Sequence, residues 1–157
     1  MVKPGAMLPD PTQPVFKLTA SPPNVAGTTH FLPLLRESYK HIAIFFIADH
    51  TLHEPHPLFH QFSALCKPYS GNLRPVILAR SLRIGGLRKP NWADDEIRFL
   101  ATNSSETEKV YGLDGKQQMG LLIVRPDGYI AFSILVNANG DAFADAGKWL
   151  AANLVRL

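Results

Sequence analysis

The stretch Gly120 to Phe132, GLLIVRPDGYIAF, decides the fold because it contains a strand, a tight turn and a returning strand. Its first half is the unbroken apolar run 121–124, which is typical of a strand covered on both faces. Pro126 then supplies a fixed φ, Asp127 tolerates the next turn position, and Gly128 can adopt the left-handed conformation. The stretch therefore predicts a central strand followed by its antiparallel partner.

Strands and helices alternate before this hairpin. Residues 40–48 and 75–82 are apolar runs that predict two more buried strands, and residues 58–67 between them have helical spacing. The strand-like segment VFKLT, residues 15–19, comes before a shorter helix expected over 31–35, and a closing helix is expected after Gly140. Two strand–helix–strand crossovers followed by a hairpin and a helix predict an α/β protein, with a mixed sheet covered on both faces.

The length of 157 residues predicts a single domain, residues 1–157. Residues 1–14 contain four prolines and are expected to form an extended, Pro-rich arm. Residues 83–109 are polar, charged and interrupted by glycine, so they are interpreted as an irregular insertion with one helical turn after Asn91.

Composition excludes several classes of protein. The formal charge of +3 is too small to indicate a nucleic-acid partner by itself. The longest apolar run, Ile42 to Ala48, is far shorter than the ~20 residues that cross a bilayer. The first residues lack the apolar segment of a secretory signal, and a lone cysteine, Cys66, agrees with a reducing compartment. We therefore expect a cytoplasmic protein with no membrane or nucleic-acid partner.

The string VYGLDGKQQMGLLIVRPDGYIAF, residues 110–132, resembles the C-terminal domain of phenol-hydroxylase-type FAD-dependent aromatic monooxygenases. At the other end, PGAMLPDP resembles the Gly-x-Arg-x-Pro start of that domain, with Met7 where an Arg is usual. The resemblance covers nearly the whole chain and implies a thioredoxin-like fold. The residues that mark it as a structural motif are Tyr111, Gly112, Arg125, Pro126, Asp127 and Gly128.

The same resemblance implies a function. Domains of this kind pack on the flavin domain and contribute to dimerisation, so the chain would not be catalytic alone. It would form a homodimer or pack against an FAD-binding monooxygenase domain or subunit. FAD is expected on that partner and no cofactor on this chain, which contains no Gly-x-Gly-x-x-Gly turn for a dinucleotide.

Thiol chemistry is an alternative. A redox protein of thioredoxin-like fold needs a thiolate at the start of the helix after the first central strand, where the helix dipole lowers the thiol pKa. Asp49 to Pro57 occupies that place and contains no cysteine. Cys66 falls near the other end of the predicted helix and is expected to be a small core residue. A degenerate thioredoxin or peroxiredoxin relative with residual thiol chemistry stays open.

A metal-binding protein or small enzyme is the other alternative. His50, His53, His56 and His60 gather in one segment, but only His56 and His60 have the i, i+4 spacing of two ligands on one helix face. A polar, His-rich loop is the favoured interpretation. The sequence therefore predicts no catalytic, cofactor-binding or metal-binding residue, with His56 and His60 as the candidates if a metal is bound.

Overall fold

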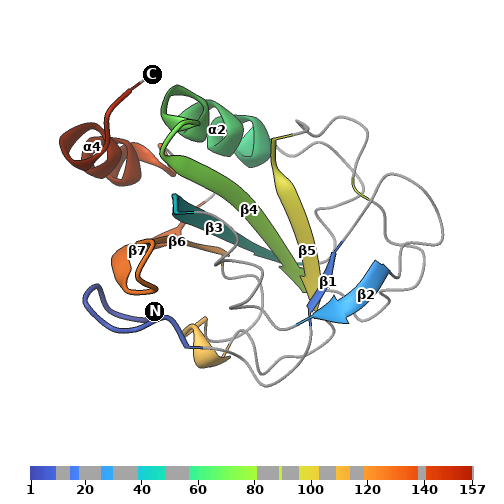
Figure 1. Ribbon diagram of the computed structural model, residues 1–157. Helices are drawn as coiled ribbons and strands as arrows, with labels where there is room; N and C mark the ends of the chain where they lie inside the picture. Colours follow the sequence, from blue (N-terminus) through green and yellow to red (C-terminus); the bar gives the residue numbers. More distant parts are fainter. Residues whose placement is uncertain are drawn as a thin grey trace.

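The computed structural model describes residues 1–9, 15–17, 26–29, 39–48, 57–80, 89, 96–102, 109–113, 119–137 and 141–156. These residues contain a mixed sheet of seven strands in the order β2-β1-β5-β4-β3-β6-β7 (Figure 1). The strands are β1 (Val15–Lys17), β2 (Ala26–Thr29), β3 (His41–Ala48), β4 (Leu73–Arg80), β5 (Arg98–Thr102), β6 (Met119–Val124) and β7 (Ile130–Val136). The helices are α2 (Pro57–Cys66), the 3-10 helix η2 (Lys67–Tyr69) and α4 (Ala144–Asn153).

The centre of the sheet combines parallel and antiparallel pairs, as the sequence predicts. β3 runs parallel to β4 and antiparallel to β6, and Phe45 lies opposite Ile77 on one side and Leu121 on the other. All three side chains are fully buried. The apolar runs form central strands because a strand covered on both faces exposes none of its side chains to water. The buried apolar residues of these strands are therefore divided between two core clusters, one on each face of the sheet.

One face of the sheet is covered by α2 and α4, and we call it the helix-covered face (Figure 1). Phe45 of β3 points into it and meets Phe59 and Phe62 of α2, with ring centroids 6.3 and 5.4 Å away. The Phe143 ring, at the start of α4, lies 5.4 Å from Phe45 in an edge-to-face arrangement. Ala146 and Leu150 of α4 are fully buried in the same cluster, so the predicted closing helix is confirmed.

The opposite, arm-covered face lies under residues 1–9 and the segment 109–113, in which two helical residues are followed by a turn. Phe46 points into it, and its ring centroid lies 4.9 Å from that of Tyr111. Tyr111 is fully buried, and its hydroxyl donates a hydrogen bond of 2.8 Å to the Pro9 carbonyl. Leu8 of the arm is also buried in this cluster. The first residues are thus part of the core and contact a turn about a hundred residues later in the chain.

The hairpin predicted from residues 120–132 is confirmed. The Gly128 amide donates to the Arg125 carbonyl at 2.9 Å, which closes the turn, and the φ of Gly128 is 88°. That left-handed conformation is inexpensive only for glycine. The Leu8 amide of the arm donates to the Gly128 carbonyl at 2.8 Å. The turn is therefore bonded both to itself and to the arm.

The structure differs from the sequence interpretation between residues 83 and 109. The expected irregular insertion contains β5, which lies between β4 and β1 in the sheet. Phe99 and Leu100 of β5 are buried and pair with Ile77 and Leu78 of β4. The segment around β5 is only weakly apolar, so its parallel partner, distant in sequence, decides its conformation. The helical turn expected after Asn91 and the helix expected over 31–35 lie outside the described residues.

Candidate functional site

Helix α2 is the element on which the thiol alternative depends, because it is the next described element after the central strand β3. It begins at Pro57, in a position where a missing amide proton costs nothing. Residues 49–56, which precede it, lie outside the described part of the chain, but the sequence contains no cysteine there. The amino end of α2 therefore offers its dipole to no thiol of this chain.

Cys66 is the last residue of α2, and its side chain is 2% exposed. Burial raises the pKa of its thiol far above the ordinary value, since an apolar surrounding disfavours the thiolate. The carboxyl end of a helix disfavours an anion as well. The expectation that Cys66 is a buried residue near the carboxyl end of the helix is confirmed. In the resting fold its thiol is protonated and covered.

The chain turns sharply after Cys66, and we call residues 67–72 the η2 corner. The Ser70 amide donates to the Lys67 carbonyl at 3.3 Å, and the Asn72 amide donates to the Tyr69 carbonyl at 2.8 Å. Tyr69 is 2% exposed and packs in the same core cluster as Cys66. The η2 corner is the short segment through which the chain passes from Cys66 to β4.

The metal candidates are not brought together in the described part of the molecule. His60 lies on an exposed position of α2, whereas His56 falls outside the described residues. Among the residues that the structure describes, no group of three or more His, Cys, Asp and Glu side chains is placed to hold a metal ion. The described helices also include none with the length and apolarity needed to cross a membrane.

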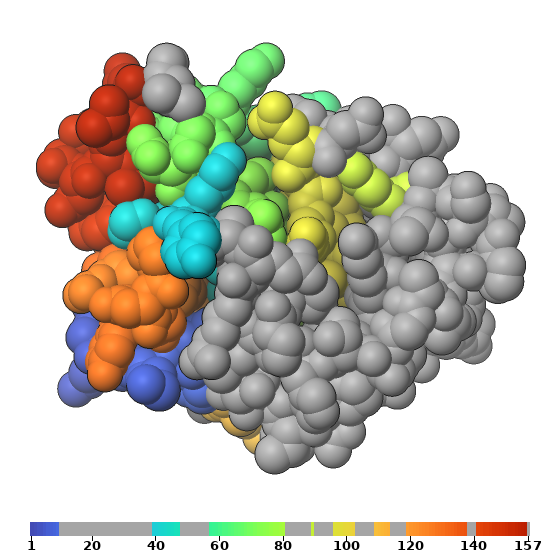
Figure 2. Space-filling view, in the orientation of Figure 1, coloured from blue at the N-terminus to red at the C-terminus, as the bar shows by residue number. Residues whose placement is uncertain are grey.

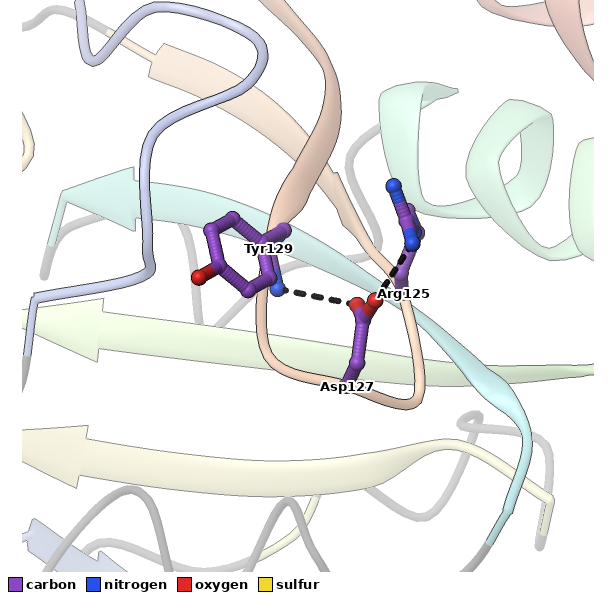
Figure 3. A network of polar contacts seen from close by, with 3 residues as sticks. All are labelled: Arg125, Asp127 and Tyr129. Atoms are coloured by element: carbon purple, nitrogen blue, oxygen red, sulfur yellow. Dashed lines mark hydrogen bonds and ion pairs between the residues drawn. The ribbon is translucent and has the colours of Figure 1, made fainter.

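The structural motif predicted from the sequence is divided between two places. Arg125 and Asp127 form an ion pair at the exposed tip of the hairpin, and Asp127 also accepts a hydrogen bond of 3.3 Å from the Tyr129 amide (Figure 3). The Arg125 guanidinium lies 6.0 Å from the centre of the Tyr129 ring. Pairs this exposed contribute little to stability. These groups close the turn of the hairpin. They are not part of the core cluster that contains Cys66.

Tyr111 and Gly112 lie on the arm-covered face. The Val2 amide donates to the Tyr111 carbonyl at 3.1 Å, and Gly112 has a φ of 69°. A Cβ atom on Gly112 would lie 2.8 Å from Met1 Cα, a separation that real structures do not tolerate. Gly112 is therefore required by the close approach of the arm. The motif residues serve the packing of the arm and the hairpin.

An open groove separates α2 from α4. It has a volume of about 680 Å³ and is lined by Gln61, Ala64, Leu65, Asp141, Phe143, Ala144 and Gly147. Sequence reasoning does not find it, because the two helices are far apart in the chain and only the sheet brings them together. Among the described residues that line it, Asp141 is the one charged side chain, and most of the others are apolar.

No protein-family model and no curated protein sequence matches this chain. Solved structures do match it. AhpC from Mycobacterium bovis has a TM-score of 0.68 at 14% identity, over 97% of this chain and 92% of that chain. Peroxiredoxin Q from Xanthomonas campestris has a TM-score of 0.61 at 14% identity, over 96% and 99%. The thioredoxin domain of a thiol-disulfide oxidoreductase from Bacteroides vulgatus has a TM-score of 0.53 at 10% identity, over 95% and 99%.

These structures correct the family resemblance drawn from the sequence. The neighbours are peroxiredoxins and thiol-disulfide proteins, so the identification with a phenol-hydroxylase C-terminal domain is wrong. The role in dimerisation and the FAD-binding monooxygenase partner follow only from that identification, so they are wrong as well. The physical reason is that GLLIVRPDGYIAF contains the residue types that a buried strand, a turn with a left-handed residue and a returning strand require. It identifies a hairpin, and a hairpin of this kind is not specific to one function.

The expected fold class, in contrast, is confirmed. At 14% identity and below, the likeness to the solved structures establishes the fold and nothing beyond it. The parallel crossover β3–α2–β4, the antiparallel β6–β7 hairpin and the closing helix α4 agree with that likeness. The chain has a thioredoxin-like fold.

Proposed function

We propose that this protein is a divergent thiol-dependent redox protein, related to peroxiredoxins and thiol-disulfide oxidoreductases, in which Cys66 carries the thiol chemistry. The observation behind the proposal is the structural likeness to AhpC over 97% of this chain and 92% of that chain. Cys66 is the one cysteine of the sequence, so a sulfenic acid or a disulfide of this chain can form only there.

The proposed reaction needs a hydroperoxide and an external thiol. The Cys66 thiolate attacks the terminal oxygen of the hydroperoxide, so that an S–O bond forms and the O–O bond breaks. The alkoxide takes a proton and leaves as an alcohol, and the sulfur is oxidised to a sulfenic acid. An external thiol then forms a mixed disulfide with release of water, and a second thiol regenerates Cys66. Both external thiols are required because the chain has no second cysteine.

The environment of Cys66 limits the rate of this reaction. The thiolate is the nucleophile, and burial raises the pKa of the Cys66 thiol, so few molecules hold the reactive form near neutral pH. With a side chain 2% exposed, the sulfur also meets a peroxide only when the surrounding chain opens. We therefore expect slow turnover that rises with pH.

Peroxide consumption and sulfenic acid trapping test the proposal together. The protein is incubated with hydrogen peroxide and dithiothreitol at neutral and at alkaline pH, and dimedone adducts are located by mass spectrometry. The expected result is an adduct on Cys66 and peroxide consumption above background, both larger at alkaline pH and both lost in Cys66→Ala. Cys66→Ser serves as a second variant of nearly unchanged volume. Equal consumption in wild type and both variants, without an adduct, overturns the proposal.

A further inference from the structure

The arm of residues 1–9 places a methionine side chain directly on strand β6. A Cβ atom added to Gly120 would lie 2.5 Å from Met1 Cε and 3.3 Å from Met1 Sδ, so the Met1 side chain fills the space above this glycine. We call that space the Gly120 notch. Met1 and Val2 pack against the core cluster of the arm-covered face. In Figure 2 the blue arm lies against the orange segment that includes β6 and β7.

The Gly120 notch is lined by apolar groups. Leu113 Cδ2 lies 2.9 Å from the same added Cβ atom, and Leu113 is buried. Phe46 pairs with Gly120 across the sheet and is buried in the same cluster. A thioether suits such a space because it is apolar and flexible. The notch therefore accepts the reduced form of Met1.

Oxidation changes what the notch must hold. A hydroperoxide oxidises a thioether by two electrons: an S–O bond forms, the O–O bond breaks, and the proton of the transferred oxygen passes to the leaving oxygen, which departs as an alcohol or as water. The product is a polar sulfoxide. A polar oxygen in an apolar space costs free energy unless it finds a hydrogen bond. Water offers that bond, so Met1 sulfoxide is more stable outside the notch than inside it.

Backbone hydrogen bonds connect Met1 to the rest of the arm. The Val2 amide, next to Met1, donates to the Tyr111 carbonyl at 3.1 Å. Further along, the Ile130 amide donates to the Ala6 carbonyl at 2.8 Å. These bonds close only while the arm lies on the sheet. Removal of Met1 from the notch therefore makes the whole arm open more often.

We propose that Met1 is an oxidation site that acts as a latch: its sulfoxide releases the arm from the arm-covered face. A methionine sulfoxide reductase reverses the change, since two thiols give up two electrons, become a disulfide and release the sulfoxide oxygen as water. Met7 lies in the same arm and is 56% exposed, so its oxidation should leave the arm in place. The latch goes beyond the proposed function and does not depend on Cys66.

Mass spectrometry and hydrogen exchange test the latch together. Wild type, Met1→Leu and Met7→Leu are released from a cleavable amino-terminal fusion, so that residue 1 is the first residue of each chain. Each is treated with hydrogen peroxide, and peptide mapping locates the added oxygen. In oxidised wild type and Met7→Leu, exchange at the Leu8 and Ile130 amides should accelerate about tenfold. Leucine fills a similar volume without sulfur, so Met1→Leu should show no acceleration.

Amides of β3 are the reference for global unfolding, and exchange there should change much less. An unoxidised Met1 beside an oxidised Met7 overturns the proposal, and so does Met1 sulfoxide without faster exchange at Leu8. Equal acceleration in β3 also overturns it. So does acceleration that persists in Met1→Leu, because oxidation of the half-buried Met119 would then be the cause. Failure of the proposed function is separate: Cys66→Ala should release its arm on oxidation whether or not Cys66 forms a sulfenic acid in the wild type.

Discussion

The two faces of the sheet bury aromatic side chains of equal size under different kinds of cover. On the helix-covered face, Phe45 meets three rings that come from α2 and the start of α4. On the arm-covered face, Phe46 meets the ring of Tyr111 beneath the arm of residues 1–9, which contains no helix. A helix satisfies most of its own backbone hydrogen bonds, whereas an extended arm must find partners elsewhere. The first face is therefore held by ring packing, and the second depends on specific hydrogen bonds.

This difference explains why the sequence motif misled about function. Tyr111, Gly112 and Gly128 all contact the arm, through the bonds to Pro9, Val2 and Leu8 and the close approach of Met1. The close approach of the arm restricts which residues can stand opposite it. These positions therefore form a recognisable sequence motif. Cys66 lies on the helix-covered face, where many apolar side chains satisfy the packing and no such pattern is imposed. Tyr111 and Cys66 therefore lie on opposite faces of the sheet.

The largest expected losses of stability come from truncating Phe45 and Phe46, two neighbouring residues that point to opposite faces of the sheet. Phe45→Ala should lower the free energy of unfolding by about 4 kcal/mol, because α2 and α4 cannot collapse far into the cavity. Phe46→Ala should cost about 3 kcal/mol, since an extended arm relaxes more easily than two packed helices. Denaturant titration measures both. A larger loss for Phe46→Ala would mean that the arm is the more rigid cover.

Substitution of two glycines with left-handed backbone tests how much the contacts of the arm contribute to stability. Gly112→Ala should cost about 3 kcal/mol, because the strained φ is joined by a collision with Met1. Gly128→Ala should cost about 1–2 kcal/mol, since nothing lies within 4 Å of the added Cβ and strain acts alone. Thermal unfolding compares them, and hydrogen exchange at the Leu8 amide reports on the arm. Equal losses in the two variants would show that the approach of Met1 contributes nothing.

The smallest effect concerns pH on the helix-covered face. Burial lowers the pKa of His41, the nearby Arg125 lowers it further, and Asp127 partly opposes them. The unfolded chain therefore binds a proton at His41 more readily than the fold does, and stability should fall as pH drops from about 7 to about 5. The effect is small because the His41 ring is only half-buried. Its centroid lies 6.3 Å from that of the Trp149 ring.

Unfolding titrations at several pH values check this dependence. His41→Asn should flatten the slope of stability against pH in that range. Asp127→Asn removes the charge that favours protonation of His41, so it should make the slope steeper. An identical slope in wild type and His41→Asn would place the proton uptake on other groups.

Local sequence patterns determined much of the fold. The apolar run 121–124 and the turn residues Pro126 to Gly128 specify the hairpin, because buried strands and left-handed turn positions accept few residue types. The place of Cys66 near the end of a helix follows from helical spacing in the same way. Strand β5 was missed, since its identity depends on pairing with β4, and that partner is distant in the chain. Pairing energy of that kind leaves no local signature.

The sequence alone determined that one cysteine exists, and that no cysteine stands where helix α2 begins. The tertiary structure decided that this cysteine is buried, in a cluster built from strands β3 and β4 and helices α2 and α4. Composition and spacing record which groups are present. Whether a thiol is ionised and reachable depends on which distant segments fold over it, because burial and contact are properties of the packed chain.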